Sequence, residues 1–205
     1  EKLYHEVELP LVTVLAHLEI NGFLVDDNQL KEFADKLGEK IDALTNEIYM
    51  LAGEEFNINS PKQLGVILFE KLELKPVKKT KTGYATNADV LEKLRDKHPI
   101  VNFIMEYRQL AKLKSTYCDG LRAVVNPNTH RIHSVFTQTV TVTGRLSSTE
   151  PNLQNIPTRT ELGREIRKMF VAKEGYVLVD ADYSQIELRV LAHIANDETM
   201  INAFR

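Results

Sequence analysis

The sequence predicts an α+β fold, in which helices fill the chain to about residue 125 and strands mix with helices from there to residue 205. Up to residue 125, apolar residues recur every three or four positions, which is the period of an amphipathic helix. The segment RIHSVFTQTVTVTG, residues 131–144, instead alternates and is rich in Thr and Val, as strands are. Further on, the apolar run YVLVDAD at residues 176–182 precedes an amphipathic stretch, which predicts a strand followed directly by a helix.

Two helices are predicted before residue 60. The first covers residues 2–20 and ends at the turn dipeptide Asn21-Gly22. Asp26 or Asp27 is suited to cap the second, which extends to about residue 52 and ends at Gly53. The buried stripe of this second helix is expected to consist of Leu30, Leu37, Ile41, Leu44 and Ile48.

Three more helices and a basic loop are predicted between residues 60 and 125. A helix from Ser60 to about Leu72 begins with a capping serine followed by a proline, the usual order at a helix start. Two further helices are predicted over residues 87–97 and 101–125. The turn-rich loop between the first two of these helices carries four lysines, Lys75, Lys78, Lys79 and Lys81.

The region after residue 126 is predicted to mix loops, strands and helices. Residues 147–160 are polar, contain two prolines and are expected to form an ordered loop. Residues 161–170 are expected to form a short helix that turns into a strand. The strand at 176–182, a helix at 184–195 and the start of another helix at 197–205 complete the chain.

Composition places the chain among soluble globular proteins. Hydrophobic residues make up 43% and charged residues 27% of its 205 residues. No apolar stretch approaches the roughly 18 residues of a membrane span, and no signal segment opens the sequence. Cys118 is the only cysteine, so an internal disulfide is excluded and an intracellular setting is indicated. The six histidines are scattered without the spacing of a zinc site.

The net charge of −3 conceals an uneven distribution of charge along the chain. Residues 1–59 contain 4 Lys and Arg against 13 Asp and Glu, whereas residues 60–117 contain 12 against 6. A concentrated basic region is compatible with phosphate binding on one face, and equally compatible with a solvated lysine-rich surface.

The junction between the strand at 176–182 and the helix after it carries two carboxylates. Val177–Val179 is apolar on both faces, as a buried central strand would be, and Asp180 and Asp182 share one face of it. Ser184 and Glu187 have the spacing of a capping box at the start of the helix. The buried side of this helix is expected to consist of Ile186, Val190, Leu191 and Ile194.

Two interpretations of this junction stay open on spacing alone. In the structural one, Asp182 caps a turn and Glu187 only satisfies the backbone at Ser184. In the functional one, a carboxylate at the end of a strand holds a divalent metal such as Mg²⁺, which prefers hard oxygen ligands. One carboxylate does not make a metal site, so a second acidic residue would have to come from elsewhere.

DYSQIELR, at residues 182–189, resembles the first catalytic motif of the family A DNA polymerases of the bacterial DNA polymerase I type. It is one of five segments that resemble that family. The other four are LPLVTVLAHLEINGFLVD at 9–26, NINSPKQLGVILFEKL at 57–72, YRQLAKLKSTY at 107–117 and VTGRLSSTEPNLQNIPTR at 142–159. They follow the order of the family and cover essentially the whole chain, so together they are highly specific.

The resemblance implies roles for the residues of the junction. Asp182 would be one of two metal-binding aspartates, with the backbone carbonyl of Tyr183 as a further ligand. The implied cofactor is Mg²⁺ in a two-ion site, which activates the primer 3′-hydroxyl and stabilises the pyrophosphate leaving group. Glu187 would be the steric gate against a ribose 2′-hydroxyl. For Asp180 the resemblance supplies no role, and a structural one is expected.

The resemblance also implies that the basic and amide side chains bind primer-template DNA. Minor-groove acceptors are nearly the same for every correct base pair, so donors there can grip any sequence. A polar surface loop and a solvated helix face are the alternatives for these residues. The predicted DNA-binding residues are Arg108 and Lys112 on one helix face, Lys78, Lys79 and Lys81 in the lysine loop, and Arg145, Asn152, Gln154, Asn155 and Arg159 in the polar loop. Tyr107, Tyr117 and Cys118 are expected to be core residues.

The domain organisation implied by the resemblance is a thumb followed by part of a palm. Residues 1–125 would form the helical thumb with its leading palm-linking helix, and residues 126–205 the first part of the palm. Fingers and the remaining palm would be absent, so the chain is expected to be inactive alone. Its unpaired palm strand is expected to permit self-association.

The expected partners are primer-template DNA and, in the full-length parent, a deoxynucleoside triphosphate, with no membrane. The expected location is the bacterial cytoplasm, in association with the nucleoid. Two other functions stay open, namely a non-catalytic DNA-binding module and a metal-dependent nuclease fragment, because paired carboxylates serve hydrolysis equally well.

Overall fold

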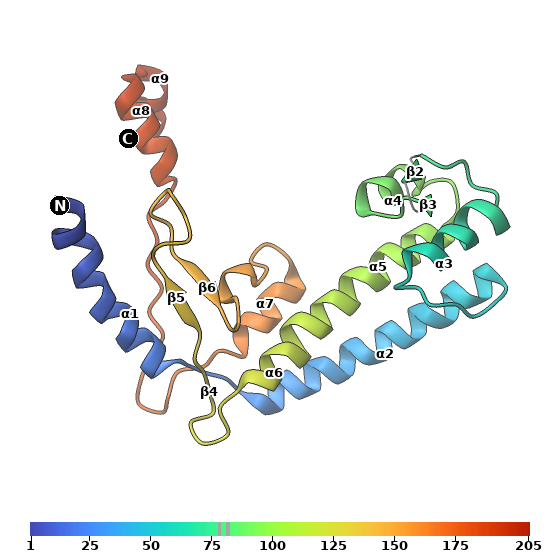
Figure 1. Cartoon of the computed structure of the whole chain (residues 1–205), viewed down its shortest axis with the longest axis horizontal. Helices are drawn as coiled ribbons and strands as arrows, with labels where there is room; N and C mark the ends of the chain where they lie inside the picture. Colours follow the sequence, from blue (N-terminus) through green and yellow to red (C-terminus); the bar gives the residue numbers. More distant parts are fainter. Residues whose placement is uncertain (78, 81–82) are drawn as a thin grey trace. The chain divides into compact units, whose positions relative to one another are not determined.

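The structure, a computed structural model, describes residues 1–77, 79–80 and 83–205, which form two compact units (Figure 1). The first unit is Glu1–Val171 and the second is Ala172–Arg205. The elements are mostly helices, and the strands form short antiparallel pairs, which confirms the predicted α+β class. This division after Val171 differs from the predicted thumb–palm boundary near residue 126, which stays a prediction.

The first unit begins with a helix that ends at a glycine. A π-helical turn at Tyr4–Glu8 continues into α1, Leu9–Asn21, as predicted. Gly22 follows with φ of 59°, a backbone conformation that residues other than glycine rarely adopt. A Cβ there would also lie 2.6 Å from the carbonyl oxygen of Ile132, so glycine is required for two independent reasons.

The long helix α2, Asp27–Ala52, begins and ends at the predicted residues. The Oδ1 atom of Asp26 accepts hydrogen bonds from the backbone N–H groups of Asn28 and Gln29 at 3.1 and 3.0 Å. At the other end Gly53 is left-handed, with φ of 71°, and its N–H donates to the Tyr49 carbonyl at 2.8 Å. Of the predicted stripe, Ile41 is half-buried and the others are buried, Leu30, Leu37, Leu44 and Ile48.

Helix α5, Pro99–Leu113, packs along α2 (Figure 1). It continues through a π-helical segment, Lys114–Asp119, into α6, Gly120–Val124, so the predicted helix over 101–125 is confirmed. Tyr117 and Cys118 are buried as predicted, and burial raises the pKa of the Cys118 thiol to about 11. Two clusters of apolar side chains fill the first unit, one at each end of the α2–α5 pair.

One end of the α2–α5 pair carries small elements around the lysine loop. These are α3, Pro61–Val66, its π-helical continuation Ile67–Lys71, and α4, Ala88–Leu94. The strands β2, Lys79–Thr80, and β3, Gly83–Tyr84, pair antiparallel. Helix α4 is shorter than the predicted span of 87–97.

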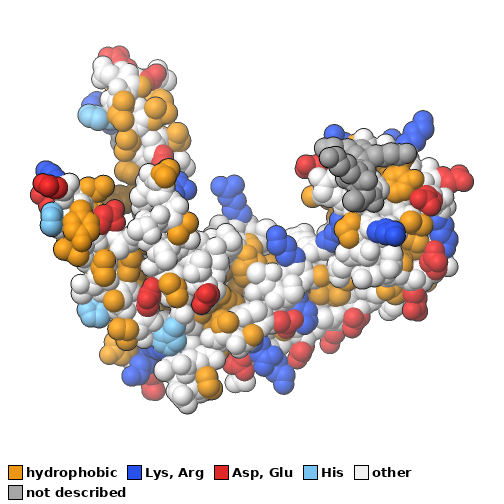
Figure 2. Space-filling model, in the orientation of Figure 1, with side chains coloured by type: hydrophobic (Ala, Val, Ile, Leu, Met, Phe, Trp, Pro, Cys, Tyr) orange, Lys and Arg blue, Asp and Glu red, His pale blue; other side chains and the backbone are white. Residues whose placement is uncertain are grey.

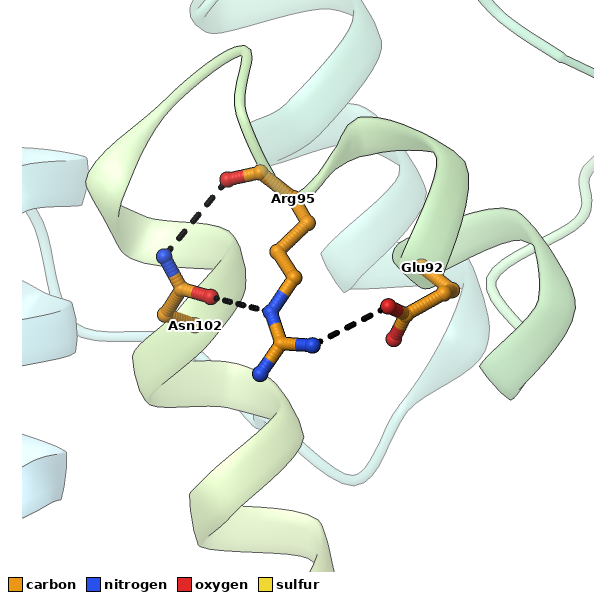
Figure 3. Close-up of polar contacts among 3 residues, drawn as sticks. All are labelled: Glu92, Arg95 and Asn102. Carbon is orange, nitrogen blue, oxygen red and sulfur yellow. Dashed lines mark hydrogen bonds and ion pairs between the residues drawn. The ribbon is translucent and has the colours of Figure 1, made fainter.

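A polar cluster joins α4 to α5 (Figure 3). The Arg95 Nε atom donates to Asn102 Oδ1 at 3.1 Å, and its Nη1 atom donates to Glu92 Oε1 at 3.0 Å. The Asn102 amide in turn donates to the Arg95 carbonyl at 3.5 Å. Glu92 and Arg95 before the turn and Asn102 after it therefore stabilise the reversal of the chain between the two helices.

The opposite end of the α2–α5 pair carries two short strand pairs. Strand β1, Phe23–Leu24, pairs with β4, Arg131–Ile132, and β5, Val135–Thr137, pairs with β6, Ser147–Thr149. The strands predicted within residues 131–144 are therefore confirmed at Arg131–Ile132 and Val135–Thr137, and the prediction is wrong beyond Thr137. Residues 138–146 connect the two paired strands β5 and β6. The backbone of this connection has no partner strand with which to form hydrogen bonds, although its side chains alternate as in a strand.

A short helix follows the polar loop. Helix α7, Glu161–Lys168, is capped by Thr160, whose Oγ1 atom accepts from the Gly163 N–H at 3.1 Å. Phe170 then makes a single antiparallel bridge to Val25, so the predicted helix is confirmed but the strand predicted after it is reduced to one isolated bridge. A one-turn 3₁₀-helix, Leu153–Asn155, lies within the preceding loop.

The second unit contains α8, Ile186–Ala195, and α9, Glu198–Ala203. The strand predicted at 176–182 is wrong, because residues 176–182 are irregular, and Val177 and Val179 are 81% and 85% exposed. A strand that is apolar on both faces needs neighbouring strands and covering layers, and residues 172–205 supply neither. The predicted self-association through a palm sheet loses its basis with this strand.

The predicted capping box at the start of α8 is also wrong. The residue before the helix is Gln185, which is left-handed with φ of 54° and makes no side-chain cap. Ser184 therefore stands outside the cap position. The predicted buried side of α8 is exposed at the surface of the second unit (Figure 2), at Ile186, Val190, Leu191 and Ile194. Only Ala192 of this helix is buried.

Across the part of the chain that the structure describes, no helix is both long enough and apolar enough to span a bilayer.

Candidate nucleic-acid interface

The polar segment 145–159, which holds half of the predicted DNA-binding residues, is braced by its own hydrogen bonds. The Gln154 amide donates to the Leu146 carbonyl at 3.0 Å and accepts from the Ser148 N–H at 3.3 Å. The buried Ser148 hydroxyl donates to the Pro151 carbonyl at 3.2 Å and accepts from the Leu153 N–H at the same distance. The segment is therefore an ordered loop, as predicted. The side-chain oxygen and nitrogen of Gln154 both make hydrogen bonds within this loop.

Two further predicted residues, Asn152 and Asn155, lie where this segment meets the π-helical end of α5. Asn152 Oδ1 accepts from the Gln154 N–H at 3.0 Å and so starts the short 3₁₀-helix. The Asn155 carbonyl accepts a short hydrogen bond from the hydroxyl of Tyr117. Both asparagine side chains are exposed, which leaves them accessible to a ligand.

A cavity of about 490 Å³ separates this segment from the helix that carries Lys112. Lys112 is exposed and lines this cavity, as do Asn152 and Asn155 of the loop. A cation and two amide side chains thus line one hollow, and this combination of groups suits a phosphate-containing backbone. The lining residues are Lys112, Thr116, Tyr117, Leu121, Pro151, Asn152 and Asn155.

Arg145 and Arg159, at the two ends of the segment, are both exposed. The carbonyl of Arg145 accepts from the Thr141 hydroxyl at 2.6 Å, which fixes the backbone there. The structure places Arg145, Asn152, Gln154 and Asn155 in one braced loop, and Lys112 of α5 lines the same cavity as Asn152 and Asn155.

Arg108 has a structural partner that the sequence did not indicate. Its guanidinium donates through Nη1 to the Thr86 carbonyl, and through Nη2 to the Thr86 hydroxyl at 3.4 Å. Burial lowers the pKa of Arg108 from its ordinary value, and Thr86 is itself buried. Arg108 and Lys112 therefore differ in surroundings, although they lie four residues apart, and Lys112 is the more accessible of the two.

The predicted lysines at the opposite end of the first unit are only partly described. Lys79 belongs to strand β2. Lys78 and Lys81 lie outside the described residues.

The predicted metal-binding residues lie in the second unit. Asp182 and Tyr183 belong to the irregular stretch before α8 and are exposed, and Glu187 lies in the first turn of α8. Arg189 orders this stretch, because its Nε atom donates to the Ser184 carbonyl at 2.8 Å and its Nη1 atom to the Phe204 carbonyl at 3.0 Å. The Arg189 guanidinium also lies over the Phe204 ring, 4.8 Å from its centroid.

These groups fit part of a Mg²⁺ site. The Asp182 carboxylate and the Tyr183 carbonyl are hard oxygen donors of the kind that Mg²⁺ takes, alongside waters or substrate phosphates. Within residues 1–77, 79–80 and 83–205, no group of three or more His, Cys, Asp or Glu side chains is placed to hold a metal ion. The donor set is thus of the right chemistry but does not form a multi-carboxylate centre.

The sequence did not indicate Tyr117, Thr86 or Arg189 as parts of these sites. Tyr117 and Arg189 donate to the backbone carbonyls of Asn155 and Phe204, whereas Thr86 accepts from Arg108 through its own carbonyl and hydroxyl. Backbone carbonyls are present at every residue, so no residue pattern marks which of them will be the acceptor.

Known proteins are similar to this chain in both sequence and fold. The family model for DNA polymerase family A matches residues 27–205. The chain is 57% identical over 204 residues to DNA polymerase I of Bacillus subtilis (strain 168), covering 99% of this chain and 23% of that protein. It is 54% identical over 205 residues to the thermostable DNA polymerase I of Thermus caldophilus, covering 99% and 25%.

A solved structure gives the same result at the level of the fold. The POL domain of Pol1 from M. smegmatis, in complex with DNA primer-template and dNTP, aligns with a TM-score of 0.89 at 45% identity. The alignment covers 99% of this chain and 36% of that one. The fold is therefore that of part of a nucleic-acid polymerase domain.

The chain belongs to DNA polymerase family A, which confirms the resemblance carried by the five motifs. It spans between 23% and 25% of the length of the two relatives named above.

Proposed function

We propose that the chain is the part of a DNA-directed DNA polymerase that grips primer-template duplex and supplies one metal-binding aspartate for nucleotidyl transfer. The observation that carries the proposal is the fold similarity, at 45% identity, to a polymerase domain whose solved structure holds DNA primer-template and dNTP. DNA is the partner of that protein, and the braced loop and Lys112 are groups with which this chain could bind the same partner. In bacteria such a protein would act in the cytoplasm, at the nucleoid.

Duplex binding would use Lys112 against the phosphates and the side chains of segment 145–159 against the minor groove. Lys112 is exposed at the wall of a cavity, and the loop opposite is held by internal hydrogen bonds. A preorganised loop loses little conformational freedom on binding. Because its donors are held in place, they would bond well to a correct base pair and poorly to a distorted one. Minor-groove donors do so without reading sequence.

For catalysis, the Asp182 carboxylate and the Tyr183 carbonyl would hold Mg²⁺, and Glu187 would exclude a ribose 2′-hydroxyl. The chemistry that two bound Mg²⁺ ions supply is activation of the primer 3′-hydroxyl and stabilisation of the pyrophosphate leaving group. The second carboxylate of such a site would come from residues other than those of this chain. By itself the chain would bind duplex without extending a primer.

The test is binding of a fluorescent primer-template duplex, measured by anisotropy over a series of salt concentrations. The wild-type chain should bind without sequence preference, with an affinity that falls as salt rises. Lys112→Gln should reduce the slope of log affinity against log salt by about 1, because one phosphate contact is lost. Lys36→Gln, an identical charge change on the exposed face of α2, should leave the slope unchanged. The absence of binding at low salt, or equal effects of the two variants, would contradict the proposal.

A further inference from the structure

Tyr117 makes a contact that none of the roles above assigns to it. Its ring is buried, 8% exposed, in the apolar cluster shared by α2 and the π-helical segment Lys114–Asp119. Its hydroxyl leaves that cluster and donates to the carbonyl of Asn155, 38 residues further along the chain. One side chain thus connects the core of the helical pair to the loop that faces Lys112.

The connection reaches the loop beyond the side-chain bonds of Gln154 and Ser148, at the 3₁₀-helix that the Ile156 N–H closes on the Leu153 carbonyl at 3.4 Å. Gln154 and Ser148 tie residues 146–153 to one another. Ser134 adds a bond from outside, from its hydroxyl to the Pro151 carbonyl at 3.0 Å. Asn155 lies beyond these bonds, at the end of the 3₁₀-helix, where the Tyr117 hydroxyl reaches its carbonyl.

Lys112, at the end of α5, and Tyr117, in the π-helical segment that follows, line the same cavity. In a regular α-helix, residues five apart are offset by about 140° around the axis, so they would face different directions. A π-helical turn closes its hydrogen bonds between residues five apart, which reduces this offset. The helical turns between Lys112 and Tyr117 change from α to π, and both residues line the cavity of about 490 Å³ together with Asn155.

We propose that Tyr117 is a positioning residue for duplex binding, which fixes the distance between Lys112 and the loop side chains Asn152 and Asn155 through its hydrogen bond to the Asn155 carbonyl. The cation that meets a phosphate and the amides that meet the duplex then form one rigid surface. This inference rests on the proposed function in its DNA-binding part. The part that concerns the order of the loop is independent of DNA.

Tyr117→Phe tests the inference, because it removes the hydroxyl and keeps the buried ring. Tyr49→Phe is the matched control, since the Tyr49 hydroxyl also donates to a backbone carbonyl, that of Phe56 at 2.9 Å, away from the loop. Hydrogen exchange of the Gln154 and Ile156 amides should accelerate roughly three- to tenfold in Tyr117→Phe, the usual effect of losing one hydrogen bond. Tyr49→Phe should leave the exchange of these amides unchanged.

Binding of the primer-template duplex by the 205-residue chain is the second measurement. Tyr117→Phe should raise Kd roughly three- to tenfold, and Tyr49→Phe should leave it unchanged. The inference is overturned if loop exchange does not change in Tyr117→Phe, or if both variants accelerate it equally, since that would be general destabilisation. It is also overturned if exchange accelerates and Kd stays the same.

Failure of the proposed function has a different signature. If the wild-type chain does not bind duplex, the proposed function is wrong and the binding role of Tyr117 with it. Loop exchange in the two variants then still decides whether the Tyr117 hydroxyl orders segment 145–159.

Discussion

Asp26 illustrates how one side chain at a helix start supports both the helix and its attachment. Its carboxylate accepts from two backbone N–H groups of α2 and from the Gln29 amide at 2.8 Å. Its own N–H donates to the Met169 carbonyl at 2.8 Å, which links α2 to the segment after α7. Capping and attachment thus meet at a single residue.

Replacing Asp26 by Ala should lower the free energy of unfolding by about 1 kcal/mol at pH 7, the usual cost of a lost N-cap. Asp26→Asn should cost less, because the amide oxygen still accepts from the backbone. Urea unfolding followed by circular dichroism measures both. An equal loss in the two variants would show that the charge of Asp26, and not its acceptor oxygen, matters.

The lowered pKa of Asp26 makes the free energy of unfolding depend on pH. Hydrogen bonds from the Gln29 backbone and side chain lower the pKa of Asp26 below its ordinary value of 3.8. A carboxylate whose folded-state pKa is lowered contributes stability above its ordinary pKa and loses it as pH falls through the folded-state value. The difference between wild type and Asp26→Asn should therefore be constant above about pH 5 and shrink below it.

Gly163 is required by the close approach of α7 to the loop before it. A Cβ at this position would lie 2.3 Å from the Pro157 carbonyl oxygen and 2.7 Å from the Pro157 Cβ. Gly163→Ala should therefore lower the free energy of unfolding by about 1–3 kcal/mol, as overpacking does. Gly38→Ala is the control, because the nearest atom there, Lys114 Cε, is 3.8 Å away. This control should stabilise α2 by about 0.5–1 kcal/mol, and a loss of stability in it would contradict the packing account.

Asp182 is the residue on which the proposed catalytic role depends. A hybrid in which this chain replaces the matching segment of the Bacillus subtilis DNA polymerase I supplies the remainder of a polymerase. In that hybrid, Asp182→Asn should reduce primer extension by about 10²- to 10⁴-fold, because a metal ligand is worth several kcal/mol. Asp180→Asn, the neighbouring carboxylate, should have little effect, and duplex Kd should stay unchanged in both. Equal loss of activity in the two variants would contradict the assignment to Asp182.

At the scale of elements, the helices could be predicted and some strands could not. Helices α2, α3 and α5 begin at a capping residue or a proline, and those signals act within one turn of chain. The Thr-Val alternation at 139–143 and the apolar run at 176–179 have strand character but form no strand. Strands need hydrogen-bond partners from elsewhere, and local sequence does not state whether a partner is present.

The predicted cap of α8 failed for the same reason at smaller scale. Ser184 and Glu187 have the spacing of a capping box, yet the left-handed Gln185 starts the helix one residue later. From within α8, the Arg189 guanidinium donates to the Ser184 carbonyl and also to the carbonyl of Phe204, the residue that follows α9. The spacing of Ser184 and Glu187 does not contain these contacts, so it could not indicate where the helix begins.

At the scale of the whole molecule, the two units differ in how much apolar surface they bury. The first unit contains both apolar clusters. In the second, Tyr176 and Tyr183 are 71% and 79% exposed and lie in an irregular stretch, so this stretch has few contacts that would resist local opening.

Limited digestion with chymotrypsin should therefore cut first between residues 176 and 183, and leave a fragment that contains the first unit. Tyr49 and Tyr117 lie in packed helices and should be cut later. Mass spectrometry of early time points identifies the site. Replacing both Tyr176 and Tyr183 by Ser should slow the first cut, and a first cut within α2 or α5 would contradict the difference between the units.

The sequence by itself determined the helical scaffold, its caps and the family of this chain. Caps, prolines and apolar periodicity act over a few residues, and five motifs in order identify a family without any structure. Only the tertiary structure decided which polar groups are spent internally, such as Arg108 on Thr86 and Tyr117 on Asn155, and which apolar segments stay uncovered. Those outcomes depend on partners many residues away, because hydrogen bonds and burial are properties of the folded neighbourhood and not of the residue itself.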